Sequence, residues 1–262
     1  MAVKAAVEAL LRDRKLDRTL TSSMPERLGK DAVSPLDIAS LDRALVGGLP
    51  RGQVSEIYGP ASSGRTSLVW AALGAATRRG EYVALVDTFD RFDPPTAAAC
   101  GIELSRLLWA RCQAISKVAG ALDPSWLPGV RPVGGAGTMV ERAIDRALKS
   151  LHLIVQSGVC TMVAIDLIDI PVPALRRLPS STWFRIERIV ENTEIAVVLC
   201  ASTPIARSKG GRSLSLGADV RWSGEHERSR RFAGVQAKAV ITAAHWSQSG
   251  AVVVNAKAVN GG

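Results

Sequence analysis

Several residue types that build common functional sites are scarce in this chain of 262 residues. It has three histidines (His152, His226 and His245), which lie too far apart in the sequence to indicate a metal site. Its four cysteines form no Cys-x-x-Cys pair, so we expect reduced, mostly buried thiols rather than a zinc site or a disulfide framework. Aromatic residues make up only 5%, which leaves little surface for stacking nucleic-acid bases.

Long apolar segments are also missing. No apolar run approaches the roughly 18 residues that a membrane span needs. Residues 1–15 place their basic side chains after the apolar ones, which is the reverse of the order in a secretory signal peptide. We therefore expect a cytoplasmic protein with no membrane partner.

Positive charge is plentiful. The chain has 33 basic and 24 acidic residues, a formal net charge of +9, and 25 of the basic residues are arginine. Residues 205–238 contain three acidic side chains and eight basic ones: Arg207, Lys209, Arg212, Arg221, Arg228, Arg230, Arg231 and Lys238. Such a concentration favours binding of a polyanion, and a solvated basic surface is the alternative.

The hydrophobic pattern predicts an α/β fold from residue 36 onward. Short apolar runs typical of strands alternate with helical periodicity, with strands expected at 54–58, 82–87, 159–166 and 195–201, and helices at 37–46, 65–79, 95–108, 138–157 and 181–192. This alternation is typical of a mostly parallel sheet that helices cover on both faces.

The pattern changes after residue 202. A Gly/Ser-rich basic loop is expected at 208–217, followed by strands at 218–223, 233–243 and 250–256 that extend the sheet in antiparallel fashion. We therefore divide the chain into an N-terminal helix and arm (1–35) and a core domain (36–262).

An amphipathic helix is expected at residues 3–18. Val7, Leu10 and Leu11 share its apolar face and are the candidate anchors for a partner. A helix this short cannot bury that face alone, so it packs either on its own domain or on a neighbouring molecule.

A phosphate-binding loop is the clearest motif. Residues 59–67 (GPASSGRTS) fit G-x-x-x-x-G-K-[ST] except that arginine replaces the lysine, and a strand precedes the loop and a helix follows it. In such loops, backbone N–H groups and the helix N-terminus surround phosphate oxygens. The candidate nucleotide-binding residues are Gly59, Ser62, Ser63, Gly64, Arg65, Thr66, Ser67 and Asp166.

Within this set, the Thr66 hydroxyl and the Asp166 carboxylate would hold Mg²⁺, because Asp166 ends a buried strand. Asp87, which ends a neighbouring strand, is a weaker candidate. ATP or ADP with Mg²⁺ is therefore the expected cofactor, and no structural metal is expected. Arg65 leaves two alternatives open, since its planar, longer head could hold a phosphate in a shifted position or fill the pocket itself.

The stretch LDRALVGGLPRGQVSEIYGPASSGRTSL (residues 41–68) resembles the RecA recombinase family. The resemblance implies a RecA-like core, an N-terminal arm that mediates self-association, and Asp166 at the Walker B position. It also implies that Arg207, Lys209 and Arg212 lie where the family's second loop grips single-stranded DNA. The family's separate C-terminal domain is expected to be absent.

Three departures from the RecA pattern affect catalysis. Arg65 replaces the lysine, Phe89 stands at the position of the catalytic glutamate, and Ser202 aligns near the glutamine that senses the γ-phosphate. Phenylalanine cannot accept a proton. Asp90, one residue further on, could replace the glutamate only if its side chain points toward the site.

This combination resembles the ImuA family, RecA-like accessory proteins of bacterial damage-induced mutagenesis. The resemblance implies an adaptor without efficient ATPase activity in the SOS response and translesion synthesis, with RecA, ImuB, an error-prone polymerase and single-stranded DNA as partners. An active DNA-dependent ATPase or minimal recombinase is the alternative, and a SulA-like inhibitor of cell division is a minor one.

Overall fold

The structure is a computed structural model that describes residues 33–112, 139–206, 210–223, 231–242 and 250–257. All of these residues lie in one compact unit, Asp31–Gly262. The predicted N-terminal helix, with Val7, Leu10 and Leu11, lies outside the described residues, as do Arg207 and Lys209. The proposed domain boundary at residue 35 therefore stays a prediction.

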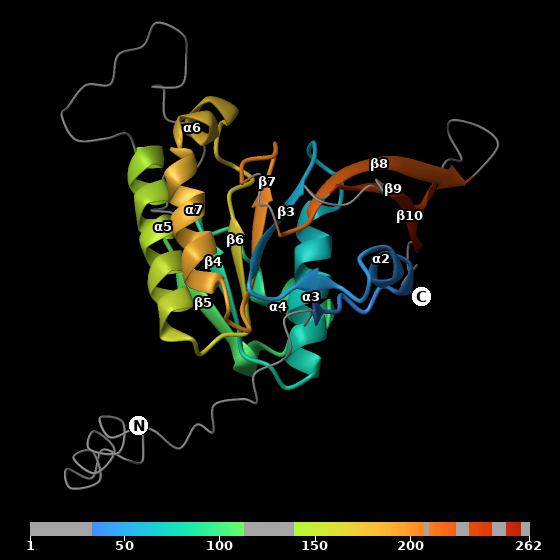
Figure 1. Cartoon of the computed structure of the whole chain (residues 1–262). Coiled ribbons are helices and arrows are strands. Elements are labelled where there is room, and N and C mark those ends of the chain that lie inside the picture. Colours follow the sequence, from blue (N-terminus) through green and yellow to red (C-terminus); the bar gives the residue numbers. More distant parts are fainter. Residues whose placement is uncertain (1–32, 113–138, 207–209, 224–230, 243–249, 258–262) are drawn as a thin grey trace, which may run out of the picture. The chain divides into compact units, whose positions relative to one another are not determined.

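An eight-stranded sheet forms the centre of this unit (Figure 1). Its order is β10 (Gly250–Lys257), β9 (Arg231–Thr242), β8 (Ser213–Ser223), β3 (Gln53–Tyr58), β7 (Ala196–Ala201), β6 (Met162–Asp166), β4 (Val83–Asp87) and β5 (Leu107–Arg111). Strands β8, β3, β7, β6, β4 and β5 pair in parallel, whereas β9 and β10 add antiparallel pairs. The predicted mostly parallel α/β sheet with antiparallel C-terminal strands is thus confirmed.

Helices cover both faces of the sheet (Figure 1). On one face, α5 (Met139–Ser157), α6 (Val172–Arg177) and α7 (Ser180–Val190) enclose one apolar cluster. On the other, α2 (Ala39–Ala44), α3 (Arg65–Arg78) and α4 (Pro94–Ala99) enclose a second cluster, which also includes residues of β8 and β9. Because both faces are covered, β4 and β7 are buried along their whole length and read as continuous apolar runs.

Local sequence explains how individual helices begin. The Asp93 carboxylate accepts a hydrogen bond from the Thr96 N–H at 3.0 Å, and prolines follow directly at the first helical positions, so α4 has a complete N-terminal cap. α5 buries one stripe at helical spacing: Val140, Ala143, Ile144, Ala147, Leu151, Ile154 and Val155.

Among the described residues, no helix has the length and apolar character needed to cross a membrane.

Three sequence-based expectations need correction. The helix expected at 95–108 is only α4, followed by a 3₁₀ turn (Leu104–Arg106) and the edge strand β5. A glycine in the left-handed region, Gly101 (φ 91°), ends the helical stretch. The Gly/Ser loop expected at 208–217 is shorter, because β8 begins at Ser213, where it pairs with Glu56 of β3. Helix α6 and the two-residue strands β1 (Val33–Ser34) and β2 (Leu49–Pro50) were not predicted.

The parallel register brings chemically important positions to one edge. Tyr58 at the end of β3 lies opposite Ala201 of β7, Cys200 lies opposite Asp166 of β6, and Asp166 lies opposite Asp87 of β4. The carboxyl ends of these strands therefore meet at the edge where open α/β sheets bind ligands.

Candidate functional site

The phosphate loop connects β3 to α3 at this edge. Ser62 (φ 60°) and Gly64 (φ 87°) both have left-handed backbones, and Gly64 caps the N-terminus of α3. Left-handed residues within a turn orient successive N–H groups toward a common concavity that suits an anion. Gly59 has a separate reason to be glycine, because a Cβ atom there would lie 2.2 Å from the carbonyl oxygen of Leu216. The backbone at Ser62 and Gly64 is therefore compatible with an anion-binding loop.

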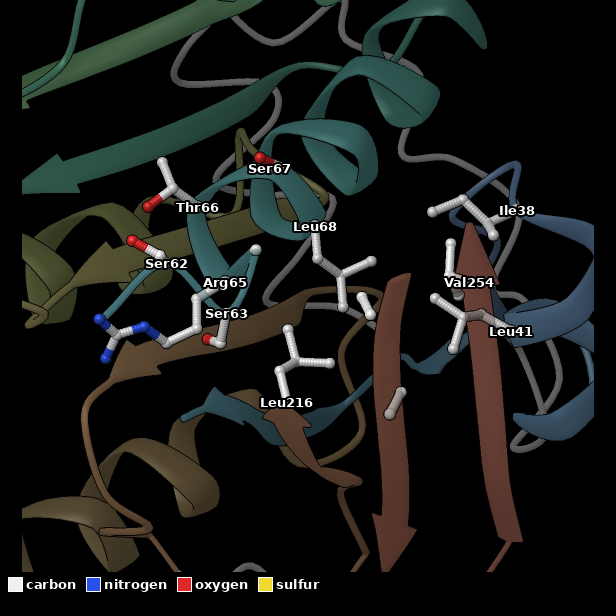
Figure 2. Close-up of a pocket in the computed structure, with 13 residues that line it drawn as sticks. Ile38, Leu41, Ser62, Ser63, Arg65, Thr66, Ser67, Leu68, Leu216 and Val254 are labelled. Carbon is white, nitrogen blue, oxygen red and sulfur yellow. The ribbon is translucent and has the colours of Figure 1, made fainter. Parts of the chain in front are cut away.

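A cavity of about 470 Å³ borders this loop (Figure 2). Residues 62–68 form one wall, and apolar side chains from α2, β8 and β10 form the other, among them Leu41, Leu216 and Val254. Six of the predicted nucleotide-binding residues line it: Ser62, Ser63, Gly64, Arg65, Thr66 and Ser67. A polar anion-binding wall opposite an apolar wall suits an organic phosphate.

Arg65 is directed away from the apolar wall, as Figure 2 shows. Its side chain is buried, with 7% of the residue exposed, and its Nη1 atom donates a hydrogen bond to the carbonyl oxygen of Ala201 at 3.0 Å. The arginine therefore ties the first turn of α3 to the end of β7. Of the two alternatives left open by the sequence, this arrangement favours the one in which the guanidinium fills part of the pocket itself.

Two buried hydroxyls at this edge have no hydrogen-bond partner among the described residues. They are Ser63 Oγ in the phosphate loop and Ser202 Oγ directly after β7. Buried polar groups are rarely left unpaired, so such atoms indicate a place where a ligand or water can bind. Ser63 also lines the cavity, which makes its hydroxyl the best-placed side-chain donor for a phosphate.

Asp166 lies at the end of β6, as predicted, and lines a second cavity of about 370 Å³ together with Thr66. Its Oδ1 accepts the N–H of Ile168 at 2.9 Å. Burial raises the pKa of Asp166 from 3.8 to about 6, nearby Asp87 and Asp169 act in the same direction, and the charge of Arg65 opposes them. Thr66 and Asp166, the two predicted Mg²⁺ ligands, thus line the same cavity, and no cluster of three or more His, Cys, Asp or Glu side chains suited to a metal occurs among the described residues.

Asp87, the weaker sequence candidate, has a structural role. Its carboxylate is 1% exposed and accepts the N–H groups of Arg91 (3.0 Å) and Phe92 (2.8 Å) as well as Nε1 of Trp109 (3.1 Å). With three donors in place, Asp87 organises the turn after β4. Trp109 gave no functional signal in the sequence, because its strand β5 was not predicted.

Phe89, which the resemblance to RecA places at the position of the catalytic glutamate, offers no carboxylate. Phe89 packs against the apolar cluster beneath α5, α6 and α7. Asp90, the possible replacement, has a left-handed backbone (φ 60°), and its carboxylate accepts hydrogen bonds from Nε and Nη2 of Arg111 at 2.6 and 2.5 Å. Arg111 in turn stacks over Trp109, with its Cζ atom 4.6 Å from the ring centroid.

The basic segment after β7 is anchored by a residue that the sequence did not single out. Glu56 of β3 is 3% exposed, and its Oε2 accepts the N–H groups of Ile205 (2.8 Å) and Ala206 (3.1 Å). Its Oε1 accepts the Ser213 hydroxyl at 2.5 Å. One carboxylate therefore fixes the chain on both sides of residues 207–209. In the sequence, the signal for this role was a single glutamate within a predicted strand.

Arg212 is the one predicted DNA-binding residue that the structure describes. Its backbone N–H donates to Ser55 Oγ at 3.1 Å, and its Nη1 donates to the Gly210 carbonyl oxygen at 3.4 Å. Burial lowers the pKa of its guanidinium. Arg212 therefore lies beside the middle of β3, because Ser213, which follows it directly, pairs with Glu56, whereas the phosphate loop begins after Tyr58.

The fold and site define a P-loop α/β protein with an altered phosphate loop. Comparison with known proteins narrows this class, because residues 20–119 match the family model of the RecA N-terminal domain. The chain is similar to the protein RecA of Leifsonia xyli (40% identity over 111 residues; 40% of this chain, 30% of the relative) and of Chlorobaculum tepidum (35% over 154 residues; 56% and 36%). It is also similar to RecA of Streptomyces venezuelae (31% over 165 residues; 61% and 36%).

Parts of the chain are thus similar to RecA, in keeping with the sheet described above. The chain spans about a third of the length of the RecA relatives that it matches. The segment that matches the family model contains the phosphate loop, Phe89 and Asp90, and it ends before Asp166 and the basic segment.

Proposed function

We propose that the chain is a RecA-like accessory protein of the bacterial SOS response and translesion synthesis, as in the ImuA family. It acts in the cytoplasm as an adaptor that binds single-stranded DNA weakly and contacts RecA, ImuB and the error-prone polymerase. The N-terminal residues Val7, Leu10 and Leu11 serve as partner anchors and allow self-association.

One observation carries this proposal: the groups that would drive ATP hydrolysis are engaged elsewhere. Arg65 is bound to Ala201, Phe89 is packed in the core, and Asp90 is paired with Arg111. A phosphate loop of retained shape beside a blocked catalytic position supports binding without efficient turnover. The paired Asp90 carboxylate also counts against the alternative of a DNA-dependent ATPase, which needs that side chain as its base.

ATP hydrolysis by the purified full chain tests the proposal. We expect turnover to stay at background with and without single-stranded DNA, in the wild type and in Asp90→Ala alike. DNA-stimulated turnover that Asp90→Ala abolishes would establish the ATPase alternative instead. A pull-down against RecA and ImuB, with a chain lacking residues 1–30 as the comparison, tests the adaptor role, and failure of the full chain to retain either partner contradicts it.

The DNA-binding part has its own test. Contacts to phosphates release counterions, so the affinity for single-stranded DNA is expected to fall steeply as salt rises. Replacing Arg207 and Lys209 by Gln should weaken binding and flatten the salt dependence, whereas Lys149→Gln on exposed α5 serves as a matched control. An affinity that salt does not change would contradict a phosphate-binding segment.

A further inference from the structure

The cavity beside the phosphate loop has two chemically distinct walls (Figure 2). Every described lining residue with a polar side chain belongs to residues 62–67, which form the end of the loop and the first turn of α3. The described lining residues outside this segment are all aliphatic: Ile38, Leu41, Leu68, Leu216, Ala237, Ala239 and Val254. Polar side chains therefore line the cavity only on the side where the loop would bind phosphate.

Two alanines of the aliphatic wall lie on a strand whose backbone is paired on both sides. Ala237 and Ala239 belong to β9, which lies between β8 and β10. Ala237, for example, lies opposite Ala218 of β8 and Val254 of β10. The N–H and C=O groups of such a central strand form the hydrogen bonds of the two ladders. A ligand that touches this strand therefore meets methyl groups and no free hydrogen-bonding group of its backbone.

Small side chains on this strand leave space for a ligand. Ala237 and Ala239 are two residues apart on β9, so their side chains point to the same face of the sheet. Both line the cavity, whose volume of about 470 Å³ accommodates a small organic molecule. A larger side chain at position 237 would therefore occupy part of this volume.

Selection between purine bases needs hydrogen bonds to their polar edges. Adenine and guanine have the same two-ring size, but an amino group of adenine is replaced by a carbonyl group in guanine, so a donor becomes an acceptor. A site that pairs with such a group rejects the wrong base strongly, because its own buried partner is left unpaired, whereas a purely apolar wall discriminates weakly. The aliphatic wall opposite the phosphate loop has no side-chain donor or acceptor among its described residues.

We infer that this cavity binds nucleoside phosphates through the phosphate loop and through apolar contact with the base, without selecting between adenine and guanine. The inference rests on the nucleotide site of the proposed function and deepens it, because it states how the part of the ligand beyond the phosphates is recognised. The affinity then depends on whether a base is present and not on which purine it is.

Titration calorimetry on the full chain tests this inference with ADP, GDP and inorganic pyrophosphate at one fixed Mg²⁺ concentration. The wild type should bind ADP and GDP with affinities that differ by less than about threefold, because neither base finds a polar partner on the aliphatic wall. Pyrophosphate should bind at least about tenfold more weakly than ADP, because it contacts the loop and leaves the aliphatic wall uncovered.

Ala237→Leu separates the contributions of the two walls. The larger side chain takes up space that the base needs, so the affinities for ADP and GDP should fall by the same factor, at least about tenfold, whereas the affinity for pyrophosphate should change by less than about threefold. Ala251→Leu, at an exposed position of β10 that does not line the cavity, is the matched control and should bind all three ligands as the wild type does. Thermal unfolding of both variants establishes that they are folded.

A difference of more than about threefold between ADP and GDP in the wild type overturns the inference. Pyrophosphate binding as tight as ADP binding, equal loss of all three ligands in folded Ala237→Leu, or no binding of either nucleotide also overturns it. If Ala237→Leu does not fold, the wild-type comparison decides by itself. None of these outcomes alters the adaptor proposal, which stands on the turnover and pull-down measurements. Conversely, loss of partner binding with equal ADP and GDP affinities overturns the adaptor role alone.

Discussion

The phosphate loop and the turn after β4 lie at the same edge of the sheet and differ in how their polar groups are paired. In the phosphate loop, the Ser63 hydroxyl is buried and has no partner in the part of the chain that the structure describes, and a cavity lies beside the loop. In the turn after β4, Asp87 accepts three donors and Asp90 is held by Arg111. The first region therefore keeps an unpaired polar group beside open space, whereas the polar groups of the second are paired within the protein.

Anion binding and catalysis place different demands on these two regions. Anion binding needs only a backbone shape, and that shape depends on Gly59 and on the left-handed residues Ser62 and Gly64. Catalysis needs a free carboxylate, and the turn after β4 has no carboxylate that is free to act as a base. Three substitutions, ordered by the size of their expected effects, test this difference in how the polar groups are paired.

Asp87→Ala should have the largest effect. It would leave three donors without their acceptor in a buried turn, so we expect the free energy of unfolding to fall by about 3 kcal/mol or more, measured by urea titration. Asp87→Asn keeps one acceptor oxygen and should lose less. A loss below about 1 kcal/mol for the alanine variant would mean that the turn is not held by Asp87.

Asp166→Asn should stabilise the protein at neutral pH. The folded-state pKa of Asp166 is raised to about 6 from 3.8, so the folded protein binds this proton more tightly and loses stability as pH rises from about 4 to 6. Asparagine can still accept the Ile168 N–H and has no charge to bury. The gain should approach zero near pH 4 and reach up to about 3 kcal/mol above pH 6.

Thermal unfolding of wild type and Asp166→Asn between pH 4.5 and 8 measures this difference. The stability gap between them should widen up to about pH 6 and then stay constant. A gap that is the same at every pH would show that ionisation of Asp166 does not limit stability.

Ser63→Ala should have the smallest effect on stability. Its hydroxyl has no partner to lose, so we expect the free energy of unfolding to stay within about 0.5 kcal/mol of the wild type or to rise slightly. ADP binding should weaken several-fold if the hydroxyl faces the phosphates. Ser181→Ala on exposed α7 controls for the loss of a hydroxyl, and equal ADP affinities in the two variants would remove Ser63 from the site.

Much of the fold could be predicted from the sequence because its strands are buried on both faces. The runs that became β4, β6 and β7 are apolar enough to be recognised without long-range information. β5 was missed because it is an edge strand of five residues that directly follows a helical turn, and its pairing with β4 is visible only in three dimensions. The start of β8 was missed because Ser213 and its neighbours are polar, and their strand conformation depends on β3.

The phosphate-loop motif could be read from the sequence, because the spacing of Gly59, Gly64 and Thr66 and the strand and helix around them are local properties. The resemblance to RecA also predicted that Arg65 and Phe89 stand at the positions of that family's lysine and catalytic glutamate. The contacts that these side chains make are visible only in the tertiary structure. Arg65 bonds to Ala201, Asp90 pairs with Arg111, and Glu56 anchors the basic segment, and each of these contacts joins residues that are distant in sequence. A side chain's partner depends on which strands lie side by side, and no local pattern contains that information.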